Sequence, residues 1–230
     1  KDIIEAHYDP EIGATVPERG FSCSSRAMPF VRAQMETFAN FGLASLDDIY
    51  GDRLEETASL EARTLQHHVF FREADGYRAQ PLPVEAQLST ALGVAGGDMD
   101  GDGHDDVFLS QNFFSVQSET PRNDGGRGLW LQGDGTGNLT AVPGHISGVL
   151  VYGEQRGAAL SDYDRDGRVD LAVAQNGAAT KLFRNVSANP GLRVSLRHRP
   201  ANLHAIGALV QLTYGDTHGP VRSISAGSGY

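Results

Sequence analysis

Two stretches of the sequence repeat the same acidic pattern. Residues 97–112 read GDMDGDGHDDVFLSQN, and residues 161–176 read SDYDRDGRVDLAVAQN. They align without a gap, with matched residues 64 positions apart, and both copies carry aspartate at loop positions 1, 3, 5 and 9. These residues are Asp98, Asp100, Asp102 and Asp106 in the first copy, and Asp162, Asp164, Asp166 and Asp170 in the second. Because like charges at this density repel each other, the repeated arrangement predicts a bound cation.

The spacing of the aspartates indicates which cation is expected. Carboxylates at positions 1, 3 and 5 converge on one point when the chain turns sharply at position 6. Both copies have glycine there, Gly103 and Gly167, where a positive φ costs little. Position 7 normally offers its backbone carbonyl, so His104 and Arg168 can differ freely. Calcium takes about six to eight oxygen ligands and suits this set, so the sequence predicts two Ca²⁺ sites, each closed by the aspartate at position 9.

EF-hand loops open with the same letters, but the residues that follow exclude this class. An EF-hand needs a bidentate glutamate at position 12 and flanking helices. Position 12 is Leu109 in the first copy and Val173 in the second. Each loop instead runs into a short segment rich in β-branched or aliphatic residues, DVFLSQN or DLAVAQN, which is typical of a strand. We therefore expect the acidic loops to join β-strands.

The repeat extends into the residues that precede each loop. Residues 67–97 and 127–160 each read as an apolar strand, a glycine-rich turn, a second strand, a proline-containing loop and a short strand that enters the aspartates. Together with the strand after the loop, this makes a four-stranded antiparallel unit of about 60 residues. Such sheets stack radially as propeller blades, because no single blade buries both its faces. The expected fold class is mainly β, a partial β-propeller of four-stranded antiparallel blades.

The repeated loops and strands resemble a known family. Residues 66–190 are similar to FG-GAP/VCBS repeats, the calcium-bearing blades of integrin-α-like propellers. The resemblance implies that the four aspartates of each loop bind one calcium ion, with the carbonyl of His104 in the first site and that of Arg168 in the second. It also implies propeller blades over residues 1–190.

The end of the chain has a second resemblance. Residues 191–230 resemble the ASPIC/UnbV module that commonly follows such repeats, with an IGA-V strand at 206–210 and the ending AGSGY at 226–230. This implies a small antiparallel β module after the blades. Because that module usually continues past the tyrosine, we expect a chain truncated inside it, in a protein of bacterial origin.

Residues 21–66 break the β pattern and are expected to form a short helical insertion. Apolar residues recur there at roughly helical spacing: Phe30, Met35, Phe38 and Phe41. A Ser–x–x–Asp pattern at Ser45 resembles a capping box, and Leu54, Ala58 and Leu65 would lie near one helical face. We predict two or three short helices, similar to the insertion carried by one branch of bacterial ASPIC/VCBS proteins. The insertion would cap a propeller edge or, alternatively, form a partner-binding lid.

Composition excludes several classes of function. The formal net charge is −10, with no cluster of lysine and arginine, so nucleic acid is not an expected partner. No apolar run is long enough for a membrane span. The single cysteine, Cys23, cannot form an internal disulfide. The motifs G-x-S-x-G and H-E-x-x-H do not occur, so we predict no catalytic and no organic-cofactor residues.

Three functions remain. The first is a calcium-binding, non-catalytic scaffold that is secreted, on the cell surface or in the periplasm, and contacts protein or glycan. The second is a polysaccharide-acting lyase or hydrolase built on a calcium-stabilised propeller. The third is a structural module within a larger assembly. Weak extracellular calcium sites, near about 10⁻⁴–10⁻³ M, fill only where calcium is plentiful, which favours an extracytoplasmic location.

One loop is the candidate for ligand recognition. Residues 113–128 form a long loop whose counterpart after Asn176 is much shorter, so its extra length is not needed to close a blade. The side chains suited to an anionic glycan are Phe113, Phe114, Arg122 and Arg127.

Overall fold

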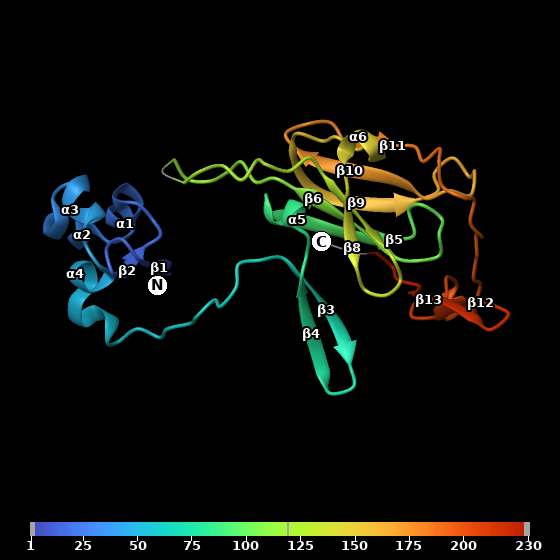
Figure 1. Ribbon diagram of the computed structural model, residues 1–230, viewed down its shortest axis with the longest axis horizontal. Coiled ribbons are helices and arrows are strands. Elements are labelled where there is room, and N and C mark those ends of the chain that lie inside the picture. The colour runs from blue at the N-terminus through green and yellow to red at the C-terminus, as the bar shows by residue number, and fades with distance from the viewer. Residues whose placement is uncertain (1–2, 119, 228–230) are drawn as a thin grey trace. The chain divides into compact units, whose positions relative to one another are not determined.

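The structure is a computed structural model that describes residues 3–118 and 120–227 (Figure 1). The chain divides into two compact units. One contains the described residues of Lys1–Leu65 and Ser115–Arg122, and the other those of Gln66–Phe114 and Asn123–Tyr230. Strands account for 33% and helices for 17%, so the predicted mainly β class is confirmed. The several small antiparallel sheets are consistent with a partial propeller.

The first unit consists of a hairpin and short helices. Its elements are β1 (Ala6–Asp9), β2 (Ala14–Pro17), α1 (Phe21–Ala27), α2 (Pro29–Met35), α3 (Phe38–Gly42), α4 (Leu46–Tyr50) and the 3-10 helix η1 (Gly51–Leu54). Its buried core is formed by Phe21, Val31, Met35, Phe41, Ala44, Ile49 and Tyr50. The predicted capping box starts α4, because the Asp48 N–H donates to Ser45 Oγ at 3.1 Å and the Ser45 N–H donates to Asp48 Oδ2 at 2.9 Å. The Ser45 hydroxyl also donates to Asp48 Oδ2 at 2.7 Å, and this bond, together with that from the Ser45 N–H, holds the pKa of Asp48 below its usual value.

The helical segment differs from the prediction in number and extent. Four α-helices and η1 lie within residues 21–54, rather than two or three helices. The expected helical face through Leu54, Ala58 and Leu65 is wrong: residues 55–67 contain no helix or strand, and Leu65 is 91% exposed. Three apolar residues among many charged ones bury too little surface to offset the cost of starting a helix. None of the helices in the described residues is long and apolar enough to cross a membrane.

The second unit is built from small antiparallel sheets. Its elements are β3 (His68–Glu73), β4 (Gly76–Pro81), α5 (Val84–Gln87), β5 (Ala91–Gly97), β6 (Asp106–Gln111), β7 (Leu129–Gly133), β8 (Leu139–Val142), α6 (Gly144–Ser147), β9 (Glu154–Ser161), β10 (Asp170–Asn176), β11 (Lys181–Phe183), η2 (Pro200–Asn202), β12 (Leu209–Tyr214) and β13 (Thr217–Ser223). Strands β5-β6-β7-β8 form one sheet in that order, and β9-β10-β11 form a second. The pairs β3–β4 and β12–β13 are separate hairpins.

The two larger sheets pack against each other along β5 and β9 (Figure 1). Glycine permits this approach, since a Cβ on Gly93 would lie only 2.9 Å from the Cα of Gly157. A buried apolar cluster lies in the same region: Met99, Phe108, Val149, Val151, Leu171 and Val173. Because Met99 belongs to the first acidic stretch, that stretch is anchored directly in the core.

The strands group differently from the predicted unit. The sequence reading paired the hairpin before each acidic loop with the two strands around it, whereas the structure pairs β5 and β6 with the hairpin that follows. Burial explains the difference. Leu129 and Leu131 of β7 are buried, while Phe70 of β3 and Tyr77 of β4 are 63% and 68% exposed. The second sheet repeats the arrangement with β9, β10 and the strand after them, β11.

The C-terminal residues contain η2 and the β12–β13 hairpin. The predicted IGA-V strand at 206–210 enters the hairpin at Leu209. Residues 228–230 of the predicted AGSGY ending lie outside the described residues. The domain boundary at residue 190 stays a prediction.

Candidate metal centre

The two acidic loops occupy equivalent places in the two sheets. The first acidic loop, residues 98–105, joins β5 to β6, and the second acidic loop, residues 162–169, joins β9 to β10. Gly103 and Gly167 at position 6 have φ values of +93° and +89°, the sharp turn expected of them. Position 4 also lies in the left-handed region, with φ +77° at Gly101 and +65° at Arg165. The sequence analysis missed this second turn, because arginine gives no signal for it.

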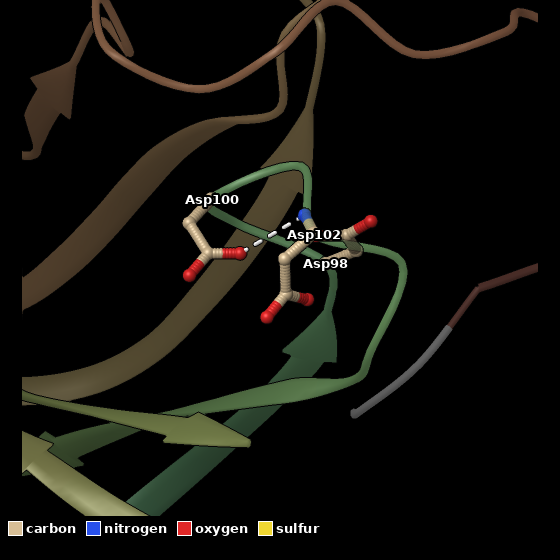
Figure 2. Close-up of side chains that lie close together, drawn as sticks. All are labelled: Asp98, Asp100 and Asp102. Atoms are coloured by element: carbon tan, nitrogen blue, oxygen red, sulfur yellow. Dashed lines mark hydrogen bonds between the residues drawn. The ribbon is translucent and has the colours of Figure 1, made fainter. Parts of the chain in front are cut away.

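Each loop brings its first three aspartates together. One carboxylate oxygen from each of Asp98, Asp100 and Asp102 lies within 4.8 Å of the others, and the same is true of Asp162, Asp164 and Asp166. Figure 2 shows the first of these two triads, with the Asp102 N–H donating to Asp100 Oδ1 at 3.2 Å. Both triads come from consecutive odd positions of one short loop, so local backbone geometry alone assembles them.

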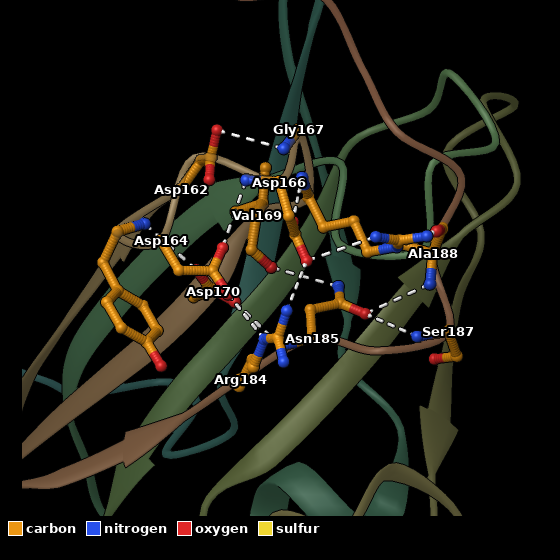
Figure 3. A network of polar contacts seen from close by, with 12 residues as sticks. Asp162, Asp164, Asp166, Gly167, Val169, Asp170, Arg184, Asn185, Ser187 and Ala188 are labelled. Carbon is orange, nitrogen blue, oxygen red and sulfur yellow. Dashed lines mark hydrogen bonds and ion pairs between the residues drawn. The ribbon is translucent and has the colours of Figure 1, made fainter.

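Backbone N–H groups hold the first aspartate of each loop in place. Asp98 Oδ1 accepts the N–H of Gly101 at 2.7 Å, and its Oδ2 accepts the N–H of Gly103 at 3.0 Å. In the second loop, Asp162 Oδ2 accepts the N–H of Gly167 at 3.2 Å (Figure 3). Asp162 Oδ1 is buried without a hydrogen-bond partner. A buried carboxylate oxygen without a donor is costly unless another positive group contacts it.

The aspartates at position 9 are bonded to backbone N–H groups, and their expected role as calcium ligands stays a prediction. Asp106 and Asp170 are 0% and 1% exposed, and each accepts two backbone N–H groups. One donor is position 2 of the same loop, Met99 at 2.8 Å or Tyr163 at 3.0 Å. The other lies at or just after the end of the third strand, and the donors there are Gly133 at 2.9 Å and Asn185 at 2.8 Å. Burial raises the pKa of Asp106. These carboxylates tie each loop to the sheet, a role the sequence analysis did not foresee.

The residues at position 7 contribute through their backbone N–H groups. His104 N–H donates to Asp102 Oδ1 at 2.8 Å, and Arg168 N–H donates to Asp166 Oδ1 at 2.9 Å. Arg168 also reaches outward, and its Nε donates to Ala188 O at 2.7 Å. Their proposed contribution through backbone carbonyls stays a prediction.

The two triads differ in their surrounding charge. In the second loop, Arg184 lies 2.5 Å from Asp164 Oδ2 and 3.2 Å from Asp166 Oδ2 (Figure 3). These contacts raise the pKa of Arg184, and the N–H of Arg168 lowers the pKa of Asp166. In the first loop, the neutral amide of Gln132 donates to Asp100 Oδ2 at 2.5 Å. The second triad is thus partly neutralised from within the chain.

The donor set fits a hard divalent cation. All six triad side chains offer carboxylate oxygens, the ligands that Ca²⁺ and Mg²⁺ prefer. Such an ion would also give the buried Oδ1 of Asp162, which has no hydrogen-bond donor, a positively charged partner.

Comparison with known families agrees with this site. Residues 98–173 match the FG-GAP-like repeat, a span that begins at the first aspartate of the first loop and includes the whole second loop. FG-GAP repeats are generally non-catalytic and typically extracellular. No curated protein matches the chain. The match does not reach the C-terminal residues, where the ASPIC/UnbV resemblance and the bacterial origin stay predictions.

Proposed function

We propose that the protein is a calcium-binding, non-catalytic propeller scaffold that acts outside the cytoplasm and contacts protein or glycan. The observation that carries this proposal is the pair of aspartate triads, assembled by loops of identical spacing in equivalent places of two sheets. The match to the FG-GAP-like repeat over residues 98–173 supports it.

Asp98, Asp100 and Asp102 would hold one calcium ion, and Asp162, Asp164 and Asp166 the other. Bound calcium would offset two of the three negative charges of each triad and fix the loop. The carbonyls of His104 and Arg168 belong to the proposed ligand set. Asp106 and Asp170 complete the proposed ligand set, and each also accepts backbone N–H groups that tie its loop to the sheet.

Calcium titration by calorimetry tests this function. We expect two ions per wild-type chain and one ion per chain in either the Asp98→Ala/Asp102→Ala or the Asp162→Ala/Asp166→Ala variant. Magnesium should bind much more weakly, because it demands a smaller octahedral shell. The absence of calcium binding at millimolar concentration would reject the proposed function.

An arginine–aromatic patch supports the ligand-binding part of the proposal. The patch consists of Phe113, Arg127, Tyr152 and Arg156. The Arg127 guanidinium lies 5.3 Å from the centre of the Tyr152 ring, and that of Arg156 lies 5.5 Å from the centre of the Phe113 ring. Tyr152 is 63% exposed. The exposed Tyr152 ring beside the Arg127 guanidinium suits an anionic sugar polymer, which offers faces to stack on and carboxylates to bind, whereas Arg156 already pairs with Glu154.

Asn112, a residue shared by both sequence copies, positions this patch. Its Nδ2 donates to Gly126 O at 2.9 Å and to Gly153 O at 3.1 Å. It therefore joins the segment that carries Arg127 to the segment that carries Tyr152. The sequence analysis selected Phe113 and Arg127 but missed Tyr152, which lies in a different loop. Phe114 is tied down instead, since its N–H donates to the carboxylate of Glu154 at 2.9 Å.

We expect the Tyr152→Ala variant to bind polygalacturonate about two- to fivefold more weakly than wild type, since an exposed cation–π site contributes about 0.5–1 kcal/mol. The matched Tyr152→Phe variant keeps the ring and should bind like wild type. Dextran serves as the neutral polymer in the same surface-plasmon assay. Equal binding by wild type and Tyr152→Ala would exclude the patch, and cleavage of polygalacturonate would favour the polysaccharide-acting enzyme over the scaffold.

A further inference from the structure

One segment contacts both acidic loops. We call residues 185–191, which follow β11, the strap. Asn185 Nδ2 donates to Met99 O in the first acidic loop at 2.6 Å. It also donates to Val169 O in the second acidic loop at 3.0 Å (Figure 3). Further along, Gly191 N–H donates to Gly167 O at 2.7 Å, and Asn189 N–H lies 3.4 Å from Asp100 O. The strap is therefore bonded to the acidic loops at both of its ends. At the first end, the side chain of Asn185 bonds both loops, and at the other end Gly191 bonds the second loop.

The strap also packs closely on the turns that shape the triads. A Cβ placed on Gly101 would lie 2.7 Å from Asn189 O, and one placed on Gly167 would lie 3.1 Å from Pro190 Cβ. Gly101 and Gly167 are both left-handed turn residues of the acidic loops. A change in the path of either turn therefore displaces the strap.

The strap is itself held in one conformation. Asn185 Oδ1 accepts the N–H groups of Ser187 at 3.2 Å and Ala188 at 3.1 Å, and Asn185 N–H donates to Asp170 Oδ1 at 2.8 Å. Asn185 thus has a partner for its backbone N–H and for both ends of its amide. A turn constrained in this way transmits a displacement from one end to the other.

We infer that the strap couples the two acidic loops, so that a cation bound in one loop raises the affinity of the other. This inference rests on the proposed function. Three carboxylates repel one another in each metal-free loop, and loosening of the first loop breaks the bonds from Asn185 and Asn189 that also order the strap. The first ion orders the shared strap, so the second ion binds a loop that is already ordered. Such coupling is reciprocal between the sites.

Calorimetry with calcium measures the coupling. In the Asp98→Ala/Asp102→Ala variant, the remaining site should bind calcium at least about fivefold more weakly than the same site does in a chain whose first loop is filled. Asn185→Ala, introduced into the chain with both loops intact, should reduce the cooperativity to that of two independent sites. Asn138→Ala is the matched control, because the Asn138 side chain donates to Asp134 and Thr136 within the turn between β7 and β8 and not to the strap.

Hydrogen exchange gives a second readout that does not depend on the Asn185 variant. In the Asp164→Asn/Asp166→Asn variant, only the first loop should fill, yet calcium should slow exchange of the Gly167 and Gly191 amides in the second loop and strap. If the wild-type chain bound two calcium ions independently, and calcium left the exchange of these amides unchanged in the variant, the coupling would be overturned and the proposed function would stand. No calcium binding in either loop would overturn both.

Discussion

We expect the Asp106→Ala variant to lose about 3 kcal/mol of unfolding free energy in the presence of a chelator, the larger part of it from two buried backbone donors left without an acceptor. The carboxylate is fully buried and accepts the N–H groups of Met99 and Gly133. One bond holds the start of the first acidic loop, and the other reaches the end of β7. The fluorescence of Trp130, the only tryptophan in the chain, reports this loss because Trp130 lies in β7.

The neighbouring Asp105 provides the control. Its side chain is 46% exposed and pairs with Arg222. Asp105→Ala should therefore cost no more than about 1 kcal/mol, as expected for an exposed ion pair. Chelator removes any contribution of a bound ion from both measurements. If Asp106→Ala were destabilising only when calcium is present, Asp106 would act as a ligand and not as an anchor.

The parts of the site that depend on neighbouring residues could be predicted from the sequence. Aspartates at positions 1, 3 and 5 meet because a short loop with a left-handed glycine, Gly103 or Gly167, leaves them few other directions. The capping box at Ser45 is equally local, and the structure confirms it. The mainly β class followed from the period of the strands and from the repeat.

The parts that depend on distant residues could not be predicted. Gly133 and Asn185 reach Asp106 and Asp170 from 27 and 15 residues away, and Asn185 reaches Met99 across 86. No periodic pattern encodes such contacts. The grouping of strands was missed for the same reason, because a hairpin before the loop and one after it look alike until burial decides which joins the sheet. Arg184 gave no signal either, since a single arginine at a strand end is usually exposed to solvent.

Calcium should raise the melting temperature of the second unit by roughly 5–10 °C for each filled loop. At a hundredfold excess over its Kd, a ligand that binds only the folded state stabilises by about 2.7 kcal/mol. Trp130 fluorescence during heating, with and without chelator, measures the shift. In limited proteolysis, calcium should protect the chain from cleavage and magnesium should have no effect, because magnesium prefers a smaller octahedral shell.

Removing two of the three charges of each triad, with side chains of nearly the same shape, tests whether the triads cause this shift. Asp100→Asn/Asp102→Asn and Asp164→Asn/Asp166→Asn keep a hydrogen-bond acceptor at every position, and each pair should abolish the calcium shift of its own loop. In chelator, the change in melting temperature relative to wild type should differ between the two variants. The first relieves repulsion among carboxylates that no arginine contacts in the described structure, so its melting temperature should rise or stay unchanged. The second deprives Arg184 of its partners Asp164 and Asp166, so its melting temperature should fall. A calcium shift that survives in both variants, or full resistance to protease in chelator, would show that these triads are not the calcium sites.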